Sequence, residues 1–293
     1  MKRPSRLNVI SRYRHVLPRA VLVNLYITMV RPVLEYCDII YDNAPAYLKI
    51  SLENVQRKAA IMCTGAYRHT ENTLLLKDLS WSTLGERRYK HKLIQFYKIY
   101  HNIYPAYLKV LFPQTNAPRY NLRINQEFKL PFYRLTNSAN SFFPSTAKVW
   151  NNIPPPIKHT DNLATFKRLL FGPTTKKDKF YNSCFGKKGN WLTRLRLGLS
   201  ALNNHRFTYH LISEPNCTHC VNTPETTEHF LLDCPKYAAP RTSFLNSLAD
   251  IGVNIVNRTD TINEILHGIS FKQNPNVILN PIYIFLTTTN RFK

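Results

Sequence analysis

Glycine is scarce in this sequence, with 8 glycines among 293 residues. Neither a G-x-G-x-x-G sequence nor a P-loop glycine run occurs, although both phosphate-binding motifs need glycine for their tight turns. With 44% hydrophobic residues and so little glycine, the chain is neither disordered nor fibrous. The composition predicts a folded protein without the common glycine-rich nucleotide-binding loops.

Long hydrophobic runs are also missing. The basic N-terminus and the stretch AVLVNLYITMV superficially match a signal peptide, but Asn24 and Tyr26 interrupt the run and no small-x-small cleavage site follows. The later stretch NVILNPIYIFLTTT is too short to span a bilayer and contains Pro281. We therefore expect an intracellular protein of the cytoplasm and nucleus, neither secreted nor inserted in a membrane. In such a reducing compartment, clustered thiols bind metal more often than they form disulfides.

Acidic residues are few: 17 Asp and Glu stand against 40 Lys and Arg, which gives a formal net charge of +23. A charge this large is hard to tolerate without a polyanionic partner. Nucleic acid is the leading candidate for that partner, and an anionic membrane surface is the second.

Hydrophobic residues recur at helical spacing in the first third of the chain. The segment RAVLVNLYITMVRPVLEYC has apolar residues on most faces, which is typical of a central, buried helix. Two amphipathic patterns follow, at Leu52, Val55, Ala59, Met62 and Ala66, and at Leu84, Ile94, Tyr97, Tyr100, Tyr104, Leu108 and Leu111. Pro105 breaks the second pattern. The sequence predicts a mainly α fold.

Prolines and aromatic residues dominate the middle of the chain, which predicts an irregular connector pinned by rings such as Phe142, Phe143 and Trp150. The sequence NLATFKRLLF is a short amphipathic helix, and the basic stretch GPTTKKDKFYNSCFGKKGN is the preferred domain boundary. We therefore expect a helical region at 1–112, a connector at 113–172 and a basic helical domain at 173–293. The last begins with a helix at about 190–204 and ends with three more.

Three of the six cysteines lie close to a histidine in the stretch NCTHCVNTPETTEHFLLDCP. Cys217, Cys220, His229 and Cys234 have the spacing C-x2-C-x8-H-x4-C. Two thiolates separated by two residues can reach one ion from a tight turn, and the second pair completes a tetrahedron. This Cys3His set suits one structural Zn2+ without an open coordination position. The alternative is a set of buried thiols beside a solvated histidine.

A short helix is expected to present the second pair of ligands. Thr223 is its predicted N-cap, Pro224 suits the first position, and Glu225 and Glu228 favour the positive end. His219 and Cys184 are substitute ligands, although His219 sits inside the x2 loop, where the geometry is poor. His205 and His210, placed on the preceding helix, are interpreted as ordinary polar or core residues.

Basic residues cluster in three places. Residues 1–34 hold seven Lys and Arg and no acid. The second cluster, interleaved with aromatics such as Phe180, Tyr181, Phe185 and Trp191, consists of Lys176, Lys177, Lys179, Lys187, Lys188, Arg194, Arg196 and Arg206. Cations neutralise phosphates and exposed rings stack on unpaired bases, so this cluster predicts binding of single-stranded nucleic acid. A solvated face with core aromatics is the alternative.

The third cluster, GERRYKHKL, leaves two interpretations open: Arg87 and Arg88 face a duplex, or they pair with Glu86 and its neighbours. Glu35, Asp38 and Asp42 share one face if their segment is a single helix. We expect them to pair with nearby arginines rather than to form a nuclease-type metal site, because no partner histidine accompanies them.

Several segments resemble, in the same order, the C-terminal part of the polyprotein of LINE-type (non-LTR) retrotransposons of the jockey-like group. The strongest likeness is in LTRLRLGLSALNNHRFTYHLISEPNCTHCVNTPETTEHFLLDCPKY, which has the family's LR-G-S helix, CCHC knuckle and ET-EHFLL-CP ending. Further matching segments are LYITMVRPVLEYCDIIYDNAP, LENVQRKAAIMCTGAYRHT, LLKDLSWSTLGERRYKHKLIQFYKIYHNIYP, SFFPSTAKVWNNIP and YIFLTTTNRF. The resemblance covers nearly the whole chain.

This resemblance implies that residues 1–112 are a thumb-like helical region and that residues 173–293 grip RNA or target DNA through a zinc knuckle. The knuckle departs from the shorter C-x2-C-x4-H-x4-C of retroviral nucleocapsids, so their mode of base recognition does not carry over. The sequence has no Asp-Asp dipeptide of the kind that holds two Mg2+ ions in the polymerase palm. We therefore expect a reverse transcriptase remnant without palm or endonuclease, and no polymerase activity.

Two functional classes follow. The first is a non-catalytic, nucleic-acid-binding remnant of a LINE-type reverse transcriptase, with retrotransposon RNA or target DNA as its partner. The second is a zinc-stabilised helical protein-interaction module, co-opted by the host, whose charge serves solubility or acidic partners. Salt dependence separates them, because neutralised phosphates make RNA affinity fall steeply with salt.

Overall fold

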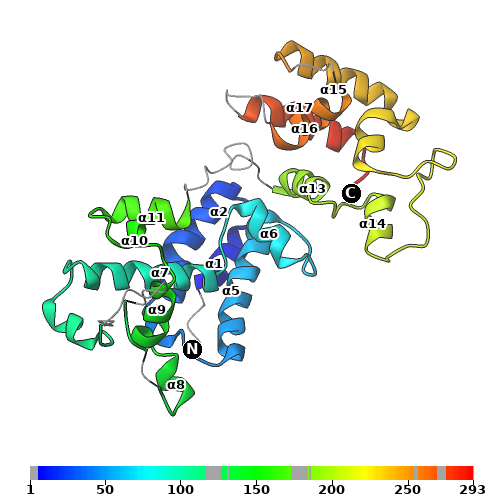
Figure 1. Cartoon of the computed structure of the whole chain (residues 1–293). Helices are drawn as coiled ribbons and strands as arrows, with labels where there is room; N and C mark the ends of the chain where they lie inside the picture. Colours follow the sequence, from blue (N-terminus) through cyan, green and yellow to red (C-terminus); the bar gives the residue numbers. More distant parts are fainter. Residues whose placement is uncertain are drawn as a thin grey trace. The chain divides into compact units, whose positions relative to one another are not determined.

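The computed structural model describes residues 6–115, 127–130, 132–172, 184, 186–253, 257–268 and 275–292. Most of these residues are helical, which confirms the predicted mainly α class (Figure 1). Extended pairing within the described part is limited to two isolated antiparallel bridges, Thr115 with Phe128 and Asn216 with Pro224. None of the described helices is both long and apolar enough to cross a membrane.

The chain forms two compact units, each assembled from segments that are distant in sequence. Unit 1 comprises Met1–Val30, Arg57–Trp81 and Lys177–Lys293, and unit 2 comprises Arg31–Gln56 and Ser82–Lys176. This division differs from the three consecutive segments expected from the sequence. The region 1–112 is shared between the units, and the segment 113–172 groups with the residues that precede it.

Unit 2 is built around one long helix, α7 (Leu84–Tyr100). A capping box starts this helix, because Thr83 Oγ1 accepts from the Glu86 amide at 3.1 Å and the Glu86 carboxylate accepts from the Thr83 amide at 3.3 Å. The other elements of unit 2 are α3 (Arg31–Leu34), α4 (Asp38–Tyr41), the first half of α5 (Ala46–Thr64), η2 (Ala106–Leu111), α8 (Thr136–Ala139), α9 (Phe142–Asn151), α10 (Pro155–Lys158) and α11 (Leu163–Phe171).

The segment expected to be an irregular connector contributes helices and much of the core of unit 2. Trp150 and Phe166 are fully buried and pack against Phe96 and Tyr97 of α7, with ring centroids 5.0 Å apart for Phe96–Trp150 and 4.4 Å apart for Tyr97–Phe166. The prolines permit these helices because they occupy first turns, where the missing N–H has no intrahelical acceptor. Pro155, for example, is the first residue of α10.

Unit 1 contains the N-terminal and C-terminal helices. Its elements are α1 (Arg6–Tyr13), α2 (Arg19–Leu25), η1 (Tyr26–Val30), the second half of α5, α6 (Asn72–Leu79), α13 (Gly186–Arg196), α14 (Asn203–Thr208), η3 (His229–Asp233), η4 (Pro235–Tyr237), α15 (Ala238–Asp250), α16 (Arg258–His267) and α17 (Pro275–Thr288). The helix expected at about 190–204 corresponds to α13, which begins and ends several residues earlier. The three helices expected at the C-terminus are α15, α16 and α17.

The single helix expected after Arg19 is interrupted. It widens into the π-helical turn η1 before Pro32, since proline cannot donate to the carbonyl four residues earlier and its ring clashes with that carbonyl. One side of the segment is buried, through Leu22, Tyr26 and Val30, while Val33 is 54% exposed. The segment is thus amphipathic rather than central.

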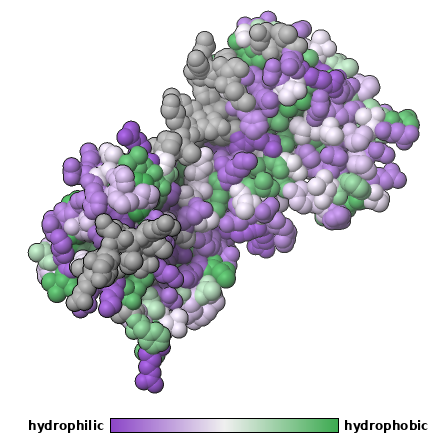
Figure 2. Space-filling model, in the orientation of Figure 1, coloured by the Kyte–Doolittle hydropathy of each residue, from purple (hydrophilic) through white to green (hydrophobic). Residues whose placement is uncertain are grey.

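The C-terminal part of unit 1 has a continuous apolar core. Phe230 packs against Phe285 and Phe292, with centroid distances of 5.5 and 5.3 Å, and Phe244 stacks on Phe285 at 4.9 Å. Leu192 of α13 belongs to the same core. Cys217 and Cys234 belong to this core as well, and Cys220 packs against it. Polar residues cover most of the molecular face in Figure 2, with apolar patches between them.

Candidate metal centre and basic surfaces

A short hairpin presents the first two cysteines. The Cys217 amide donates to the Thr223 carbonyl at 2.8 Å, and the Glu225 amide donates to the Pro215 carbonyl at 2.8 Å. Asn222 adopts a left-handed conformation, with φ 53°, in the turn between them. The predicted N-cap role of Thr223 is therefore wrong: the Thr223 carbonyl is used by the hairpin, and the helix begins later.

The second pair of donors comes from the turn that follows. Thr226 Oγ1 accepts from the His229 amide at 3.0 Å and starts the turn that continues as η3. The Cys234 amide donates to the His229 carbonyl at 2.8 Å, a π-type bond between residues five apart. In an α-helix such residues would lie about 140° apart around the axis. The wider π turn brings His229 and Cys234 to the same side.

The four side chains converge. One donor atom from each of Cys217, Cys220, His229 and Cys234 lies within 4.8 Å of the others. The Sγ atom of Cys234 is 3.8 Å from that of Cys217 and 3.9 Å from that of Cys220. Two thiolates bound at ~2.3 Å to one tetrahedral ion are separated by about 3.8 Å. These side chains can hold a metal ion, as predicted from their spacing.

His229 supports the same conclusion. It is 6% exposed, and its Nε2 atom is buried without a hydrogen-bond partner. A buried polar atom left unsatisfied is costly, whereas coordination to a metal ion would satisfy it. Burial raises the pKa of the Cys234 thiol to about 11, and the neighbouring Cys217 adds to the shift. A bound ion therefore has to displace thiol protons.

Two arginines that the sequence patterns do not indicate support the site, one through backbone carbonyls and one through a buried carboxylate. Arg241 is buried and donates from Nε to the Leu231 carbonyl at 2.9 Å and from Nη2 to the Cys234 carbonyl at 2.6 Å. Arg291 grips the buried Glu225 carboxylate with two bonds, of 2.7 and 2.6 Å. No local sequence signal marks Arg241, whereas Arg291 lies in the terminal NRF segment that belongs to the noted resemblance.

The substitute ligands lie elsewhere. His219 Nε2 is 2.5 Å from the Lys236 ammonium and exposed, and Cys184 is buried in the apolar core of unit 1. His205 of α14 is in contact with the Ser200 hydroxyl at 2.8 Å and the Thr227 hydroxyl at 3.2 Å. Burial lowers the pKa of His205 despite the opposing charge of Glu225. His210 follows α14 and is exposed.

The predicted cationic cluster separates into exposed and engaged residues. Lys187, Lys188 and Arg206 are exposed. Arg194 is engaged, since it donates from Nε to the Gly65 carbonyl at 3.0 Å and its guanidinium lies 4.2 Å from the Tyr67 ring centroid. Three further predicted residues, Lys176, Lys177 and Lys179, lie outside the described residues, as do Phe180, Tyr181 and Phe185.

Arg196 belongs to a buried ion-pair group. Its side chain is 7% exposed and pairs with Asp78, which also accepts from Arg19 at 2.6 Å. Burial lowers the pKa of Arg196, and the charge of Arg19 acts in the same direction. The guanidinium nevertheless stays charged, because an arginine beside a buried carboxylate does not release its proton. Arg196 thus joins α13 to α2 and α6.

The arginines of the third cluster pair with carboxylates of unit 2. Arg87 binds Glu35, with Nη2 3.0 Å from Oε2, and the buried Arg88 binds Asp42 at 3.3 Å. Their partners are thus more distant in sequence than Glu86. Burial raises the pKa of the Asp42 carboxyl, but the hydrogen bond from Lys92 and the charges of Lys92, Arg88 and Lys49 together lower it below its ordinary value.

The carboxylates at 35–42 do not share a helix face, because the helix is interrupted between α3 and α4, where Cys37 has a φ of 54°. Asp38 contacts His91 Nδ1 at 2.5 Å, so a histidine does accompany one of these carboxylates, contrary to the expectation from the sequence. The expected arginine pairing holds for Glu35 and Asp42. Within the described residues, metal-donor groups of three or more are confined to the Cys217 cluster.

Comparisons with known proteins give no assignment: no family model, no curated protein and no solved structure matches the chain.

Proposed function

We propose that this chain is a non-catalytic nucleic-acid-binding protein of the LINE-type reverse transcriptase kind, whose C-terminal fold is stabilised by one structural zinc ion. The observation that carries the proposal is the convergence of three thiols and one buried, unpartnered imidazole nitrogen. Its partner is retrotransposon RNA or target DNA, in a ribonucleoprotein of the cytoplasm and nucleus.

Zinc fits the donor set better than other common ions. Sulfur ligands are soft, which disfavours Mg2+ and Ca2+, and a mixed sulfur and nitrogen tetrahedron suits Zn2+. Four protein donors leave no position for a reacting water, so the ion supplies stability rather than catalysis. It links the hairpin of Cys217 and Cys220 to the π turn of His229 and Cys234.

Charge supports nucleic acid as the partner. The chain carries +23, and several of its buried or half-buried arginines pair with Asp78, Glu35 and Asp42. Lys187 and Lys188 on α13 and Arg206 on α14 remain exposed. Such cations contact phosphates and release counterions on binding. The proposed surface is therefore the exposed part of α13 and α14.

Binding of the zinc-loaded full chain to a single-stranded RNA, followed by fluorescence anisotropy from 50 to 200 mM salt, tests the function. We expect a steep loss of affinity with salt. The double substitution Lys187→Gln and Lys188→Gln should weaken binding and flatten the salt slope by about two. The matched control is Lys148→Gln with Lys167→Gln, which removes the same charge from exposed positions of unit 2.

Two results would contradict the proposal. Affinity that is absent or independent of salt favours the protein-interaction module. Equal effects of the two double variants would show that net charge, rather than the proposed surface, drives binding. With Mg2+ and a primed template, we expect no nucleotide incorporation.

A further inference from the structure

A groove in unit 1 is lined in part by the exposed Arg68 and Arg206. Its volume is about 590 Å³. One wall is the turn 67–70 after α5, the floor is Leu199–Ala201, and the other wall is α14 with the turn that follows it. Tyr67 and Tyr209 are each 45% exposed there, and Leu211 is 69% exposed. Aromatic and apolar surfaces are therefore accessible in this groove.

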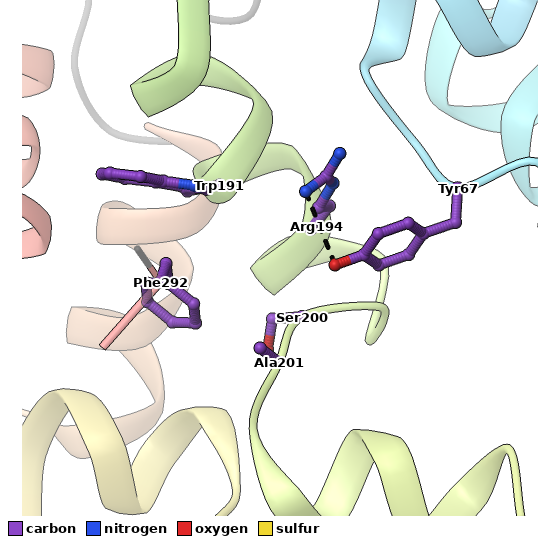
Figure 3. A pocket seen from close by; sticks show the side chains of 6 residues that line it. All are labelled: Tyr67, Trp191, Arg194, Ser200, Ala201 and Phe292. Carbon is purple, nitrogen blue, oxygen red and sulfur yellow. Dashed lines mark hydrogen bonds between the residues drawn. The ribbon is translucent and has the colours of Figure 1, made fainter. Parts of the chain in front are cut away.

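A smaller pocket adjoins this groove and shares Tyr67, Ser200 and Ala201 with it (Figure 3). Its remaining lining is Trp191, Arg194 and Phe292. In Figure 3 the Arg194 guanidinium lies beside Tyr67, and its Nη1 donates to the Tyr67 hydroxyl at 3.5 Å. The guanidinium also lies 4.2 Å from the ring centroid of Tyr67, a cation–π contact. Tyr67 thus lies at the edge of the groove, with Arg194 against its ring.

Hydrogen bonds to backbone carbonyls hold the turn 67–70, which forms the first wall, in place. Arg57 donates to the carbonyls of Arg68 and Thr70, at 3.0 and 2.6 Å, and the Thr70 amide donates to the Tyr67 carbonyl at 3.1 Å. Gly65, the residue after α5, has a φ of +68°, and an added Cβ there would lie 1.9 Å from Asn190 Oδ1. The turn and α13 are therefore packed closely together.

The second wall is attached to the candidate metal centre. Asn203 at the start of α14 donates from its amide to the Glu225 carboxylate at 2.8 Å and from Nδ2 to the Asn216 carbonyl at 2.7 Å. His205 contacts Thr227, two residues before His229. The hairpin that carries the cysteines thus positions the helix that carries Arg206 and leads to Tyr209.

We propose that this groove is a binding site for unpaired nucleotides of a single-stranded nucleic acid, an inference that rests on the proposed function. Bases would stack on Tyr67 and Tyr209, and phosphates would contact the exposed Arg68 and Arg206 at the two walls. Base–aromatic stacking and cation contacts are the two components of single-strand binding. Carboxylates, which would repel phosphate, are absent from the described lining of the groove.

The test uses the zinc-loaded full chain and three probes: a 12-nucleotide oligo(U), the same length of abasic backbone, and a 12-base-pair RNA duplex. Wild type should bind oligo(U) more tightly than either of the other probes. Tyr67→Ala and Tyr209→Ala should each weaken oligo(U) binding by about 5- to 150-fold, the range for one lost stacking contact, and leave abasic binding unchanged. The control Tyr107→Ala removes a ring that is 69% exposed in unit 2 and should change neither.

A second readout separates stacking from a fold defect. A 2-aminopurine within the oligonucleotide should lose fluorescence on binding wild type and regain it with Tyr209→Ala, whose melting temperature should match wild type. Equal affinity for abasic and base-bearing probes, or variants that behave like Tyr107→Ala, would overturn the groove assignment while leaving the proposed function intact. Failure of wild type to bind any of the probes would instead overturn the proposed function itself.

Discussion

At the scale of single residues, His229 is the most informative side chain. Its place in a group of side chains that can hold a metal ion could be predicted from the spacing C-x2-C-x8-H-x4-C, because ligand spacing is local in sequence. The backbone conformation that brings His229 to the site could not be predicted from the sequence. The π turn of η3 and the Thr226 cap depend on packing of Phe230 and Leu231 in the core. Arg241 was missed because its role is to bind carbonyls contributed by another element.

Replacing His229 with leucine should abolish metal binding, since it removes one of four donors and puts an apolar side chain in the site. His219→Leu is the matched control, because His219 is exposed and lies outside the group of converging donors. Cobalt titration followed by absorption of the thiolate-to-metal bands measures the effect. A His229→Leu chain that binds cobalt like the control would exclude His229 as a ligand.

At the scale of secondary-structure elements, the helices that carry regular apolar spacing were predictable. The pattern from Leu52 to Met62 lies in α5, and the sequence NLATFKRLLF contains α11. The middle of the chain was not predictable in the same way, since proline counts do not reveal that a proline such as Pro155 sits in a first turn. Contacts between distant elements, such as Arg196 with Asp78, leave no local pattern at all.

The group of Arg19, Asp78 and Arg196 predicts a large effect on stability. Asp78→Ala leaves two nearly buried guanidinium groups without their shared carboxylate, which should cost about 3–5 kcal/mol. Asp161→Ala, at an exposed position, should change stability by less than about 0.5 kcal/mol. Urea unfolding followed by circular dichroism compares the two. Equal midpoints for both variants would show that the ion pairs do not join α2, α6 and α13.

At the scale of the whole molecule, composition alone allowed predictions, whereas the division into units did not follow from the sequence. The net charge of +23 and the lack of long apolar runs are properties of the entire chain and need no structure. The division into two units, whose segments alternate along the sequence, could not be predicted from the sequence. It depends on long-range contacts such as that of Arg194 with Gly65. The groove between the turn 67–70 and α14 arises from the same long-range pairing.

X-ray absorption spectroscopy, with elemental analysis, on the purified full chain tests the proposed zinc site itself. We expect one zinc ion per chain, with three sulfur neighbours at about 2.3 Å and one nitrogen at about 2.0–2.1 Å. A chain purified without zinc, thiols bridged to each other, or a zinc shell made mainly of oxygen would contradict it.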